Sequence, residues 1–463
     1  MKQKCACPMT RARLFGAWLT TLSAVAFCLL SASAVSAEQQ GECQSLVTAK
    51  MIAPASVGSS AEWLAAKTVV VHTPGDELFF GVVHPAAALF ERPFSIDGAR
   101  KEHADFICLM AKNGVKVLRL VDILLAGTLE SNGAPRPGLE LDELRALASE
   151  SLRYDTKALP KNLASAQEAY KKEVVAKLHP KELVSITLQR PLINLQSTKG
   201  HNTGLMASYV TDPVMNLYFM RDQVITTAKG VVVGHFNAPQ REQETKIARF
   251  AYNKLGVSPV YEVSGKARLE GGDFIPAGDT ALIGQGLRSN AEAIAQLLKA
   301  DVFGSKWVAV VKDAWKNQDQ MHLDTYFNVI DKNLAVIVEE RIDQFDDSGN
   351  IIKASDPAKK SLVDLYEIKD GKYVKTAGDI PFQKFLEEDL KMKLIPVSNA
   401  DQLKYGINFV SVGARKILAI DGVSEGYKQR LANEGVDVTW MNFYNLTGGY
   451  GAAHCTTQVI RRE

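Results

Sequence analysis

The sequence has little cysteine and little histidine, six and eight residues respectively among 463. Cys5, Cys7 and Cys28 lie close to the start, and the other three cysteines are far apart, so the chain does not have the cysteine pattern of a disulfide framework. The few histidines show no convincing spacing of metal ligands. We therefore expect neither a disulfide-stapled scaffold nor a metal site, and we expect no cofactor.

A clear excess of positive charge is also absent. The first 37 residues contain four basic and no acidic residues, so the rest of the chain carries 50 basic and 52 acidic residues. It has no cluster of lysine and arginine that would indicate binding to nucleic acid or to an anionic membrane. With 46% hydrophobic and 23% charged residues the composition is that of a globular protein, which excludes disorder.

The first 37 residues have the pattern of a secretory signal peptide. Basic residues precede an apolar stretch of about 17 residues, 14–30, and small residues end the segment at Ala37. An uncleaved membrane anchor is the alternative, but the stretch is at the short limit for a membrane span and is interrupted by polar residues. We expect cleavage before Glu38, a periplasmic or secreted protein, and no stable membrane insertion afterwards.

Residues 38–60 are small and polar and are interpreted as an N-terminal tail, and residues 61–463 as the catalytic domain. In that domain short apolar runs alternate with amphipathic stretches, which predicts an α/β fold. The predicted strands are 68–72, 115–120, 224–227, 231–235, 281–283, 308–311, 335–338, 409–412 and 417–420, and the predicted helices are 97–113, 242–255 and 290–298. Periodicity alone does not decide between a closed arrangement and an open sheet.

Two segments depart from this alternation. Residues 135–195 are interpreted as a helical insertion, with no strand in the part 139–183. Residues 343–378 are polar and charged and are interpreted as a surface excursion. Cys108 lies in the predicted helix 97–113, where we expect a buried structural thiol.

Residues with chemical potential concentrate in four short segments: 216–222, 270–273, 321–325 and 448–455. A strand from Met321 to Ile330 would place His322 and Asp324 on one face, because side chains alternate along a strand. Glu270-Gly-Gly-Asp273 places two carboxylates around glycines that let backbone approach a ligand closely. Taken singly, each is more often a structural histidine or an ordinary turn, so the evidence lies in their combination.

Cys455 lies in a loop rich in glycine and alanine, directly after His454 and eight residues before the chain end. A flexible loop is a suitable mount for a nucleophilic thiol. The thiol attacks as a thiolate, and nearby positive charge from a substrate or a protonated histidine would favour that form. A buried terminal cysteine without a chemical role is the alternative.

The four segments together resemble the motifs of the arginine deiminase family, in the family's order: Asn216-Leu-Tyr-Phe-Met-Arg-Asp222, Leu269-Glu-Gly-Gly-Asp273, Met321-His-Leu-Asp-Thr325 and Ala453-His-Cys-Thr-Thr-Gln458. Similarity at Val69-Val-Val-His-Thr-Pro-Gly75 and nearby segments extends the resemblance to about residues 65–461. It implies a pentein-like, five-bladed α/β propeller with a helical insertion. The implied reaction is hydrolysis of free L-arginine to L-citrulline and ammonia.

The resemblance also implies a role for each matching residue. Cys455 would be the nucleophile, His322 and Glu270 would handle protons, and Asp222 and Asp324 would hold the guanidinium group. A guanidinium is planar and offers five donors, so carboxylates on two sides can orient its carbon toward a thiol. The remaining site residues are Asn216 and Phe219, which would line the substrate, Arg241 and Arg288, which would bind its carboxylate, and Asp273, which would support the site.

Other functions remain open at this point. An amidinotransferase or a hydrolase of methylated arginine would use the same residue types. A deiminase of peptidyl arginine is disfavoured, because Arg241 and Arg288 suit a free carboxylate. A non-catalytic periplasmic arginine-binding protein would not need Cys455. Tyr450, in the loop before the cysteine, departs from the commonest form of the motif and would affect how the loop gates the site. A homo-oligomer is compatible with the sequence.

Overall fold

The computed structural model describes residues 57–463 except residues 347 and 349. The predicted signal peptide and nearly all of the predicted tail lie outside the described residues. The chain divides into two units, 1–46 and 47–463, and all that follows concerns the second. Among the described residues no helix has both the length and the apolar character required to cross a membrane.

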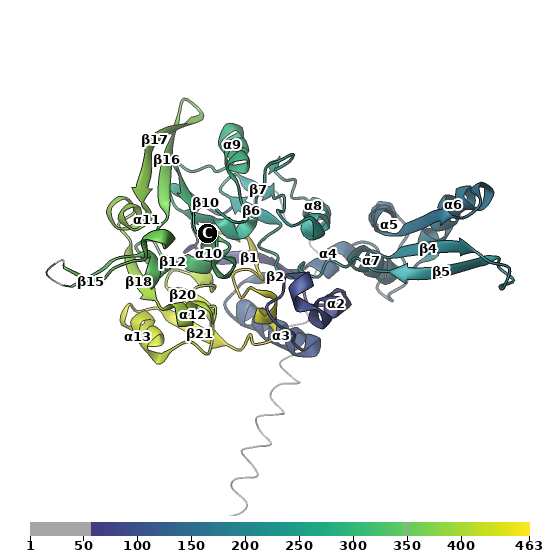
Figure 1. The fold of residues 1–463 in the computed structure, drawn as a ribbon, viewed down its shortest axis with the longest axis horizontal. Coiled ribbons are helices and arrows are strands. Elements are labelled where there is room, and N and C mark those ends of the chain that lie inside the picture. The colour runs from purple at the N-terminus through teal and green to yellow at the C-terminus, as the bar shows by residue number, and fades with distance from the viewer. Residues whose placement is uncertain (1–56, 347, 349) are drawn as a thin grey trace, which may run out of the picture. The chain divides into compact units, whose positions relative to one another are not determined.

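The second unit contains strands and helices throughout (Figure 1). The strands are β1 (Ala66–Val71), β2 (Lys116–Arg119), β3 (Arg153–Ala158), β4 (Leu192–Ser197), β5 (Leu205–Val210), β6 (Val224–Thr227), β7 (Gly230–Val233), β8 (Tyr261–Glu262), β9 (Phe274–Ala277), β10 (Thr280–Gln285), β11 (Trp307–Lys312), β12 (Phe327–Asp331), β13 (Leu334–Val338), β14 (Gln344–Phe345), β15 (Ile351–Lys353), β16 (Leu362–Lys369), β17 (Lys372–Pro381), β18 (Lys393–Val397), β19 (Val410–Gly413), β20 (Lys416–Ile420), β21 (Asp437–Met441) and β22 (Gln458–Arg462). The helices are α2 (Phe79–Val83), α3 (Ile96–Lys112), α4 (Leu120–Leu125), α5 (Leu139–Ser151), α6 (Lys161–Lys177), α7 (Pro180–Gln189), α8 (Glu242–Lys254), α9 (Ala291–Ala300), α10 (Leu323–Tyr326), α11 (Phe382–Lys384), α12 (Asn399–Gln402) and α13 (Glu425–Asn433).

Five sheets share one pairing scheme, in which a central strand pairs antiparallel with one neighbour and parallel with the other. Their strand orders are β22-β1-β2, β6-β7-β8, β9-β10-β11, β12-β13-β18 and β19-β20-β21. Helices α3, α8, α9 and α13 lie in the connections between the parallel strands of four of these sheets. Parallel strands need such a crossover, and the alternation makes the fold α/β, as the sequence predicts.

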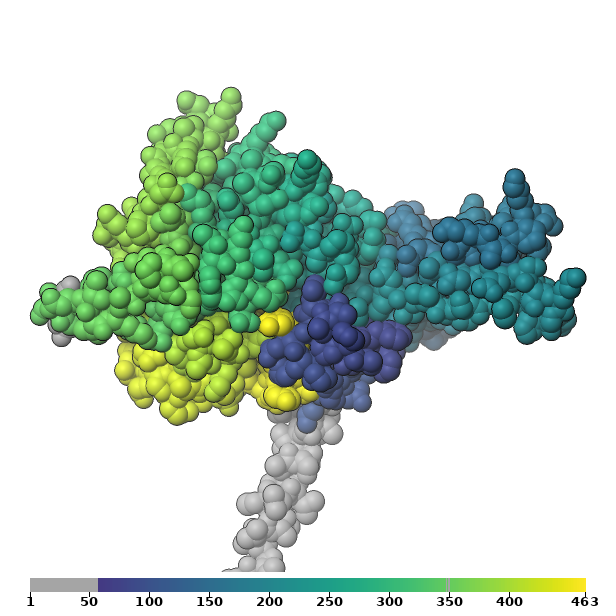
Figure 2. All heavy atoms as spheres, viewed as in Figure 1, coloured from purple at the N-terminus to yellow at the C-terminus, as the bar shows by residue number. Residues whose placement is uncertain are grey.

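The central strands are buried on both faces. Every residue of β7 and β13 is buried, and both sequences are runs of small or branched apolar residues. Such runs suit strands covered on both sides. The first sheet joins the two ends of the described chain, because β22 pairs with β1. In Figure 2 the surfaces of the N-terminal residues, in purple, and the C-terminal residues, in yellow, adjoin.

The sequence-based elements of this alternating part are confirmed within a few residues. The predicted helix 97–113 is α3, which ends before Gly114, and the predicted strand 115–120 is β2. Ser95 caps the start of α3 by accepting a hydrogen bond from the backbone nitrogen of Gly98. Local apolar periodicity and capping residues therefore predict these elements well.

The expectation that residues 139–183 contain no strand is wrong. Strand β3 lies between α5 and α6, and it pairs with β4, which pairs with β5. The sequence of β3, Arg-Tyr-Asp-Thr-Lys-Ala, is polar, and none of its residues is buried, so it lacks the apolar alternation by which a strand is recognised. Apolar side chains of α5 and α7, such as Leu141 and Leu183, share a buried cluster with Ile247 of α8.

The segment 343–378 is also more ordered than a simple excursion. Strands β14 and β15 form an exposed hairpin, but β16 pairs with β11 and, together with β17, extends the sheet of β9-β10-β11. Charged side chains of the segment form ion pairs with the neighbouring strand: Asp364 of β16 lies 2.7 Å from Lys312 of β11. The polar composition of the segment gives no indication that its strands pair with β11 and with each other.

The expectation of a buried structural thiol at Cys108 is wrong as well. Its side chain is only partly buried, and the residue is disulfide-bonded. Cys455 is the free cysteine among the described residues. Cysteines far apart in the sequence give no indication of which pair is close in space.

Candidate active site

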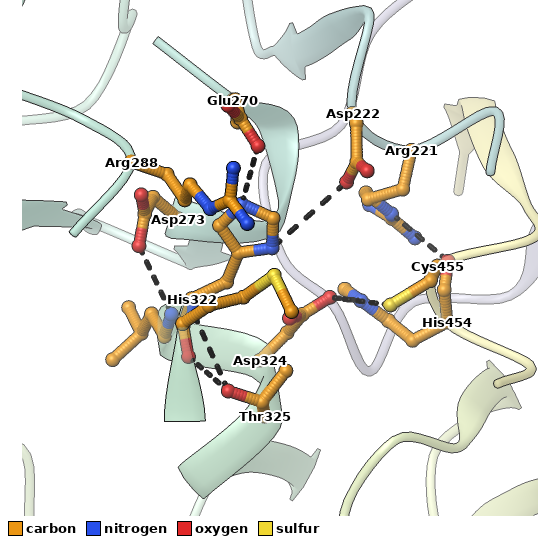
Figure 3. A network of polar contacts seen from close by, with 12 residues as sticks. Arg221, Asp222, Glu270, Asp273, Arg288, His322, Asp324, Thr325, His454 and Cys455 are labelled. Carbon is orange, nitrogen blue, oxygen red and sulfur yellow. Dashed lines mark hydrogen bonds and ion pairs between the residues drawn. The ribbon is translucent and has the colours of Figure 1, made fainter. Parts of the chain in front are cut away.

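Most of the expected catalytic residues lie shortly before the first residue of a strand. In each case the strand is an outer strand of its sheet, and the sheets differ. Asp222 lies two residues before β6, Asp273 directly before β9, and Cys455 three residues before β22. His322 and Asp324 precede β12 by a few residues. Because these strands occupy the same position in sheets of one pairing scheme, the repeated unit brings the loops to a common place (Figure 3).

His322 begins helix α10, so the expectation that residues 321–330 form one strand is wrong. The strand β12 starts only at Phe327, after a single helical turn. Asp273 stabilises this turn, because its Oδ1 accepts a hydrogen bond from the backbone nitrogen of Leu323 at 3.0 Å. The two residues of this contact are 50 positions apart in the chain, so no local sequence pattern reveals it. The contact nevertheless determines the local structure here.

His322 forms a buried ion pair with Glu270, whose Oε2 lies 2.9 Å from Nε2 of the ring. Burial alone would lower the pKa of His322, but the hydrogen bond to Glu270 and the charges of Asp222 and Asp273 outweigh it and raise the pKa to about 9. Burial alone would raise the pKa of Glu270, but the interactions with His322 outweigh burial and lower this pKa to about 2. The ring is therefore protonated at neutral pH and can act as an acid.

Gly272 lets the turn between the two carboxylates approach the ring. A Cβ atom at this position would lie 2.6 Å from Nδ1 of His322 and 3.0 Å from Oδ1 of Asp324. Both distances are too short for a side chain. Of the glycine pair singled out in the sequence, Gly272 thus allows close packing against His322, and Gly271 packs against the backbone of Arg221.

Asp222 is held by one of its two carboxylate oxygens. Its Oδ2 accepts a hydrogen bond from Nη1 of Arg241 at 2.8 Å, and Arg241 in turn forms a bidentate pair with Glu244 at 2.9 and 2.8 Å. The other oxygen, Oδ1, is buried, lies 4.0 Å from Nδ1 of His322 and has no hydrogen-bond partner among the described residues. Burial raises the pKa of Asp222 against the opposing charges of Arg241 and His322.

Asp324 is arranged in the same way. Its Oδ2 lies 2.6 Å from Nδ1 of His454 and 3.8 Å from Sγ of Cys455. Its Oδ1 is buried and, within the described part of the chain, without a hydrogen-bond partner. Two buried carboxylate oxygens near the thiol thus lack a donor, which a guanidinium group would supply.

Cys455 is buried, with 4% of its surface exposed. Burial and the charges of Asp324 and Asp222 raise the pKa of the thiol well above its usual range. Asn408 opposes this shift, because its amide nitrogen donates a hydrogen bond to Sγ at 3.2 Å. The oxygen of the same amide accepts from the backbone nitrogens of Ala452 and Cys455, so Asn408 also fixes the nucleophile loop.

The expected substrate-lining residues surround one small cavity of about 20 Å³. Its walls include Asn216, Phe219, Asp222, Arg241, Arg288, His322 and Cys455. A cavity of this size holds about one water molecule, so the binding of an amino acid requires a lining side chain to move. Met321 and Tyr450 line both this cavity and a neighbouring one of about 190 Å³.

The two arginines expected to bind a carboxylate differ in their contacts. Arg241 is engaged by Asp222 and Glu244, as described above. Arg288 makes one side-chain hydrogen bond with the described residues, from Nη2 to Oε1 of Gln318 at 3.3 Å, and its buried Nε has no hydrogen-bond partner among them. Arg288 is thus better able to accept a new anion.

Three site residues escaped the sequence reasoning in whole or in part. Asn408 was not identified, nor was Glu62, whose Oε1 lies 3.2 Å from Nε2 of His454, and His454 itself was considered only as the neighbour of the cysteine. Asn408 lies two residues before β19, a strand that the sequence predicts. Because the other site residues also lie just before strands, this position could have marked Asn408 as a candidate. Glu62 lies before β1 and gave no such signal.

The similarity to known proteins extends over the part of the chain that contains the four motif segments. The family model described as arginine deiminase matches residues 87–462. An arginine deiminase of Halobacterium salinarum is 27% identical, with alignment over 88% of this chain and 96% of the relative. The arginine deiminases of Metamycoplasma hominis and Streptococcus gordonii are 25% and 26% identical over 86% of this chain and 94% and 96% of their own lengths.

Solved structures also resemble the chain at low identity. A mutant form of DDAH from Pseudomonas aeruginosa, in complex with citrulline, has a TM-score of 0.48 and 13% identity, covering 86% of this chain and 99% of its own. An amidinotransferase from Microseira wollei has a TM-score of 0.47 and 12% identity, covering 88% and 97%. Neither likeness bears on the choice of substrate. The match of the family model over most of the chain does establish the relationship: this protein belongs to the arginine deiminase family.

Proposed function

We propose that this protein hydrolyses free L-arginine to L-citrulline and ammonia. The observation that carries the proposal is a pair of buried oxygens, Oδ1 of Asp222 and Oδ1 of Asp324, which have no hydrogen-bond partner among the described residues and belong to the two carboxylates that raise the pKa of the Cys455 thiol. An ionised carboxylate oxygen buried without a donor is costly, and a planar guanidinium supplies donors on two sides. Arg288 lines the same cavity and suits the carboxylate of a free amino acid.

Binding of the cationic substrate favours the thiolate form of Cys455 that attacks it. In the free protein the thiol is held protonated by burial and by the charges of Asp324 and Asp222. A guanidinium between these carboxylates offsets their charge and so lowers the pKa of the thiol toward its ordinary value. Thiolate then forms in the presence of a cationic substrate.

The reaction proceeds in two displacements. Sγ of Cys455 attacks the guanidinium carbon and forms a tetrahedral adduct. His322, protonated in its ion pair with Glu270, gives its proton to the departing nitrogen, the C–N bond breaks, and ammonia leaves a covalent thiouronium. The neutral ring then takes a proton from water as the water attacks the same carbon. Cleavage of the S–C bond releases citrulline and regenerates the thiol.

The decisive test is formation of citrulline and ammonia from L-arginine by the chain starting at Glu38, beside a Cys455→Ala variant. We expect equal amounts of the two products and none from the variant. A Glu270→Gln protein, quenched during turnover, should show a mass increase on Cys455 equal to arginine less ammonia. Binding of arginine by the folded protein without products, or transfer of the amidino group to an added amine in preference to water, would contradict the proposal.

We also propose that the five sheets of common pairing are the blades of a five-bladed propeller, with residues 135–195 as an insertion. The repetition of one pairing scheme and the position of the site loops before β6, β9, β12, β19 and β22 support this arrangement. A crystal structure would test it, because the five sheets should surround one axis passing near Cys455. An open row of sheets would contradict it.

We further propose that the protein is exported, with removal of residues 1–37. The disulfide of Cys108 supports this proposal, because such bonds persist in oxidising compartments. Mass spectrometry of protein from the periplasm and medium of an expressing bacterium should find a chain that begins at Glu38. Full-length protein confined to the cytoplasmic fraction would contradict export.

A further inference from the structure

The two carboxylates beside the thiol are held by matching arrangements of different residues. Asp222 is bonded through Oδ2 to Arg241, which is paired with the buried Glu244. Asp324 is bonded through Oδ2 to His454, whose other ring nitrogen faces the buried carboxylate of Glu62 at 3.2 Å. In each case one oxygen is fixed by a cationic type of side chain, and Oδ1 remains without a partner in the described part of the chain.

The ring of His454 must donate from both nitrogens. Nδ1 lies 2.6 Å from an oxygen of Asp324 and Nε2 lies 3.2 Å from an oxygen of Glu62, and an ionised carboxylate only accepts hydrogen bonds. The ring and both carboxylates are almost completely buried, with at most 2% of each side chain exposed. Each ring nitrogen of His454 thus faces a carboxylate oxygen, an arrangement that suits a cationic ring.

The oxygen of Glu62 that faces His454 also contacts two arginines. This oxygen, Oε1, lies 2.6 Å from Nη2 of Arg462 and 3.8 Å from Nη2 of Arg221. The backbone nitrogen of Arg221 donates to the carbonyl of Cys455, so the same cluster touches the nucleophile loop. Glu62 lies outside residues 87–462, the part matched by the family model. The segment before β1 thus contributes a charged group behind the active site.

We propose that His454, backed by Glu62, is the positioning residue that orients Asp324 toward the guanidinium and supplies positive charge beside the thiol. The inference rests on the proposed deiminase function for its substrate. Release of Oδ2 would let the carboxylate of Asp324 rotate, so that Oδ1 no longer meets the guanidinium in a fixed direction. A misplaced reacting group costs mainly the chemical step.

Two substitutions separate the bond to Asp324 from the bond to Glu62. The amide nitrogen of asparagine reaches the place of Nδ1, and that of glutamine reaches the place of Nε2. His454→Asn should keep the hydrogen bond to Asp324 and retain kcat/KM within about tenfold. His454→Gln should lose that bond and lower kcat by roughly 10²-fold, with a smaller change in KM. Equal loss in both variants, or kcat near wild type in His454→Gln, would overturn the positioning role.

A second readout does not depend on arginine turnover. The rate of alkylation of Cys455 by iodoacetamide at pH 8 reports how much thiolate the free protein contains. Both neutral variants remove positive charge beside Asp324, so both should alkylate several-fold more slowly than wild type. Unchanged rates would overturn the assignment of positive charge to His454. If wild type releases no citrulline while both variants alkylate slowly, the proposed function fails and the charge assignment stands.

His72→Gln is the matched control for folding. His72 is also a buried histidine paired with a buried glutamate, Glu77, at 2.9 Å, but it does not line the active-site cavity. Its substitution should lower the melting temperature by an amount similar to that of His454→Gln and leave kcat within a few-fold of wild type. A comparable loss of kcat in His72→Gln would mean that the loss in His454→Gln is a general effect of a broken buried pair.

Discussion

The two ends of the substrate cavity are built differently. At the end proposed to meet the guanidinium, Asp222, Glu270, His322 and Asp324 are nearly inaccessible, and each is held by a short hydrogen bond or ion pair. At the end proposed to meet the carboxylate, Arg288 makes a single hydrogen bond with the described residues, at 3.3 Å. The reacting end is therefore fixed in advance, and the recognition end keeps capacity for a new partner.

This difference separates the two quantities that a deiminase assay measures. Groups fixed around the reacting carbon act on the transition state, so their loss should lower kcat. A donor that binds the distant carboxylate acts equally on the ground state and the transition state, so its loss should raise KM. Arg241 belongs by its contacts to the first end, because it is bonded to Asp222 and Glu244.

The largest effect is expected for Glu270→Gln, which removes the charged partner of the catalytic histidine. We expect kcat to fall by roughly 10²- to 10⁴-fold, the usual contribution of acid–base catalysis. Without this partner the pKa of His322 falls from about 9, so the ring loses its proton at lower pH. The alkaline limb of the profile of kcat/KM against pH should therefore shift to lower pH.

Glu77→Gln is a suitable control, because it breaks another buried histidine–glutamate pair of the same 2.9 Å length. It should alter thermal stability without shifting the pH profile. A profile that is identical in wild type and Glu270→Gln would show that Glu270 does not govern the protonation of His322.

A large effect with two opposite signs is expected for Asp324→Asn. Turnover should fall by about 10²-fold, because the guanidinium is no longer oriented on one side. The thiol, in contrast, should become more reactive, because the charge of Asp324 contributes to the raised pKa of Cys455. Iodoacetamide should therefore modify the free variant several-fold faster than wild type at pH 8.

In wild type the alkylation rate should rise about tenfold per pH unit up to pH 9, since the thiol pKa lies well above its usual range. Asp222→Asn is the matched variant on the other side of the thiol and should change both readouts in the same directions. Slower alkylation in either variant would mean that the carboxylate does not raise the thiol pKa.

A moderate effect confined to KM is expected for Arg288→Ala. Loss of a charge-assisted hydrogen bond to the substrate carboxylate costs roughly 1.5–3 kcal/mol, which corresponds to a rise in KM of roughly 10- to 100-fold. Agmatine, which lacks the carboxylate, should be processed equally poorly by wild type and variant. A fall in kcat with constant KM would place Arg288 at the reacting end instead.

The smallest effect is expected for Gln318→Ala, which removes the hydrogen bond that holds Arg288. An ordinary hydrogen bond contributes about 0.5–1.5 kcal/mol, so KM should rise by roughly two- to tenfold. In the background of Arg288→Ala the same substitution should have no further effect on KM. An additive effect in the double variant would show that Gln318 acts independently of Arg288.

Much of the fold could be read from local pattern. The strands around Val224, Val308 and Ile417 are short runs of branched apolar residues, and they are buried on both faces as such runs suggest. Strand β3 escaped because its polar residues are only partly buried or exposed. A strand that owes its existence to pairing partners rather than to its own hydrophobicity leaves no local signal.

The site could be predicted as a set of residues but not as a geometry. The four motifs identified Cys455, His322 and the carboxylates. The structure places Cys455, His322 and Asp222 in the wall of one cavity, and Glu270, Asp273 and Asp324 in contact with residues 322–323 and 455. The helical turn at His322 depends on a capping bond from Asp273, which lies 50 residues earlier. Asn408 contacts the thiol from a segment that carries no motif.

The sequence alone determined the residue types, their order and the α/β alternation, because these depend on local composition and periodicity. Its motifs also carried the resemblance that implied the reaction, whereas the residue types alone, a thiol, an imidazole and carboxylates, suit a transferase as well as a hydrolase. Only the tertiary structure decided which oxygen of Asp222 and Asp324 is held and which has no hydrogen-bond partner among the described residues. Burial and the charges of residues far apart in the chain set the pKa of His322 and Cys455, and both arise only when the chain is folded.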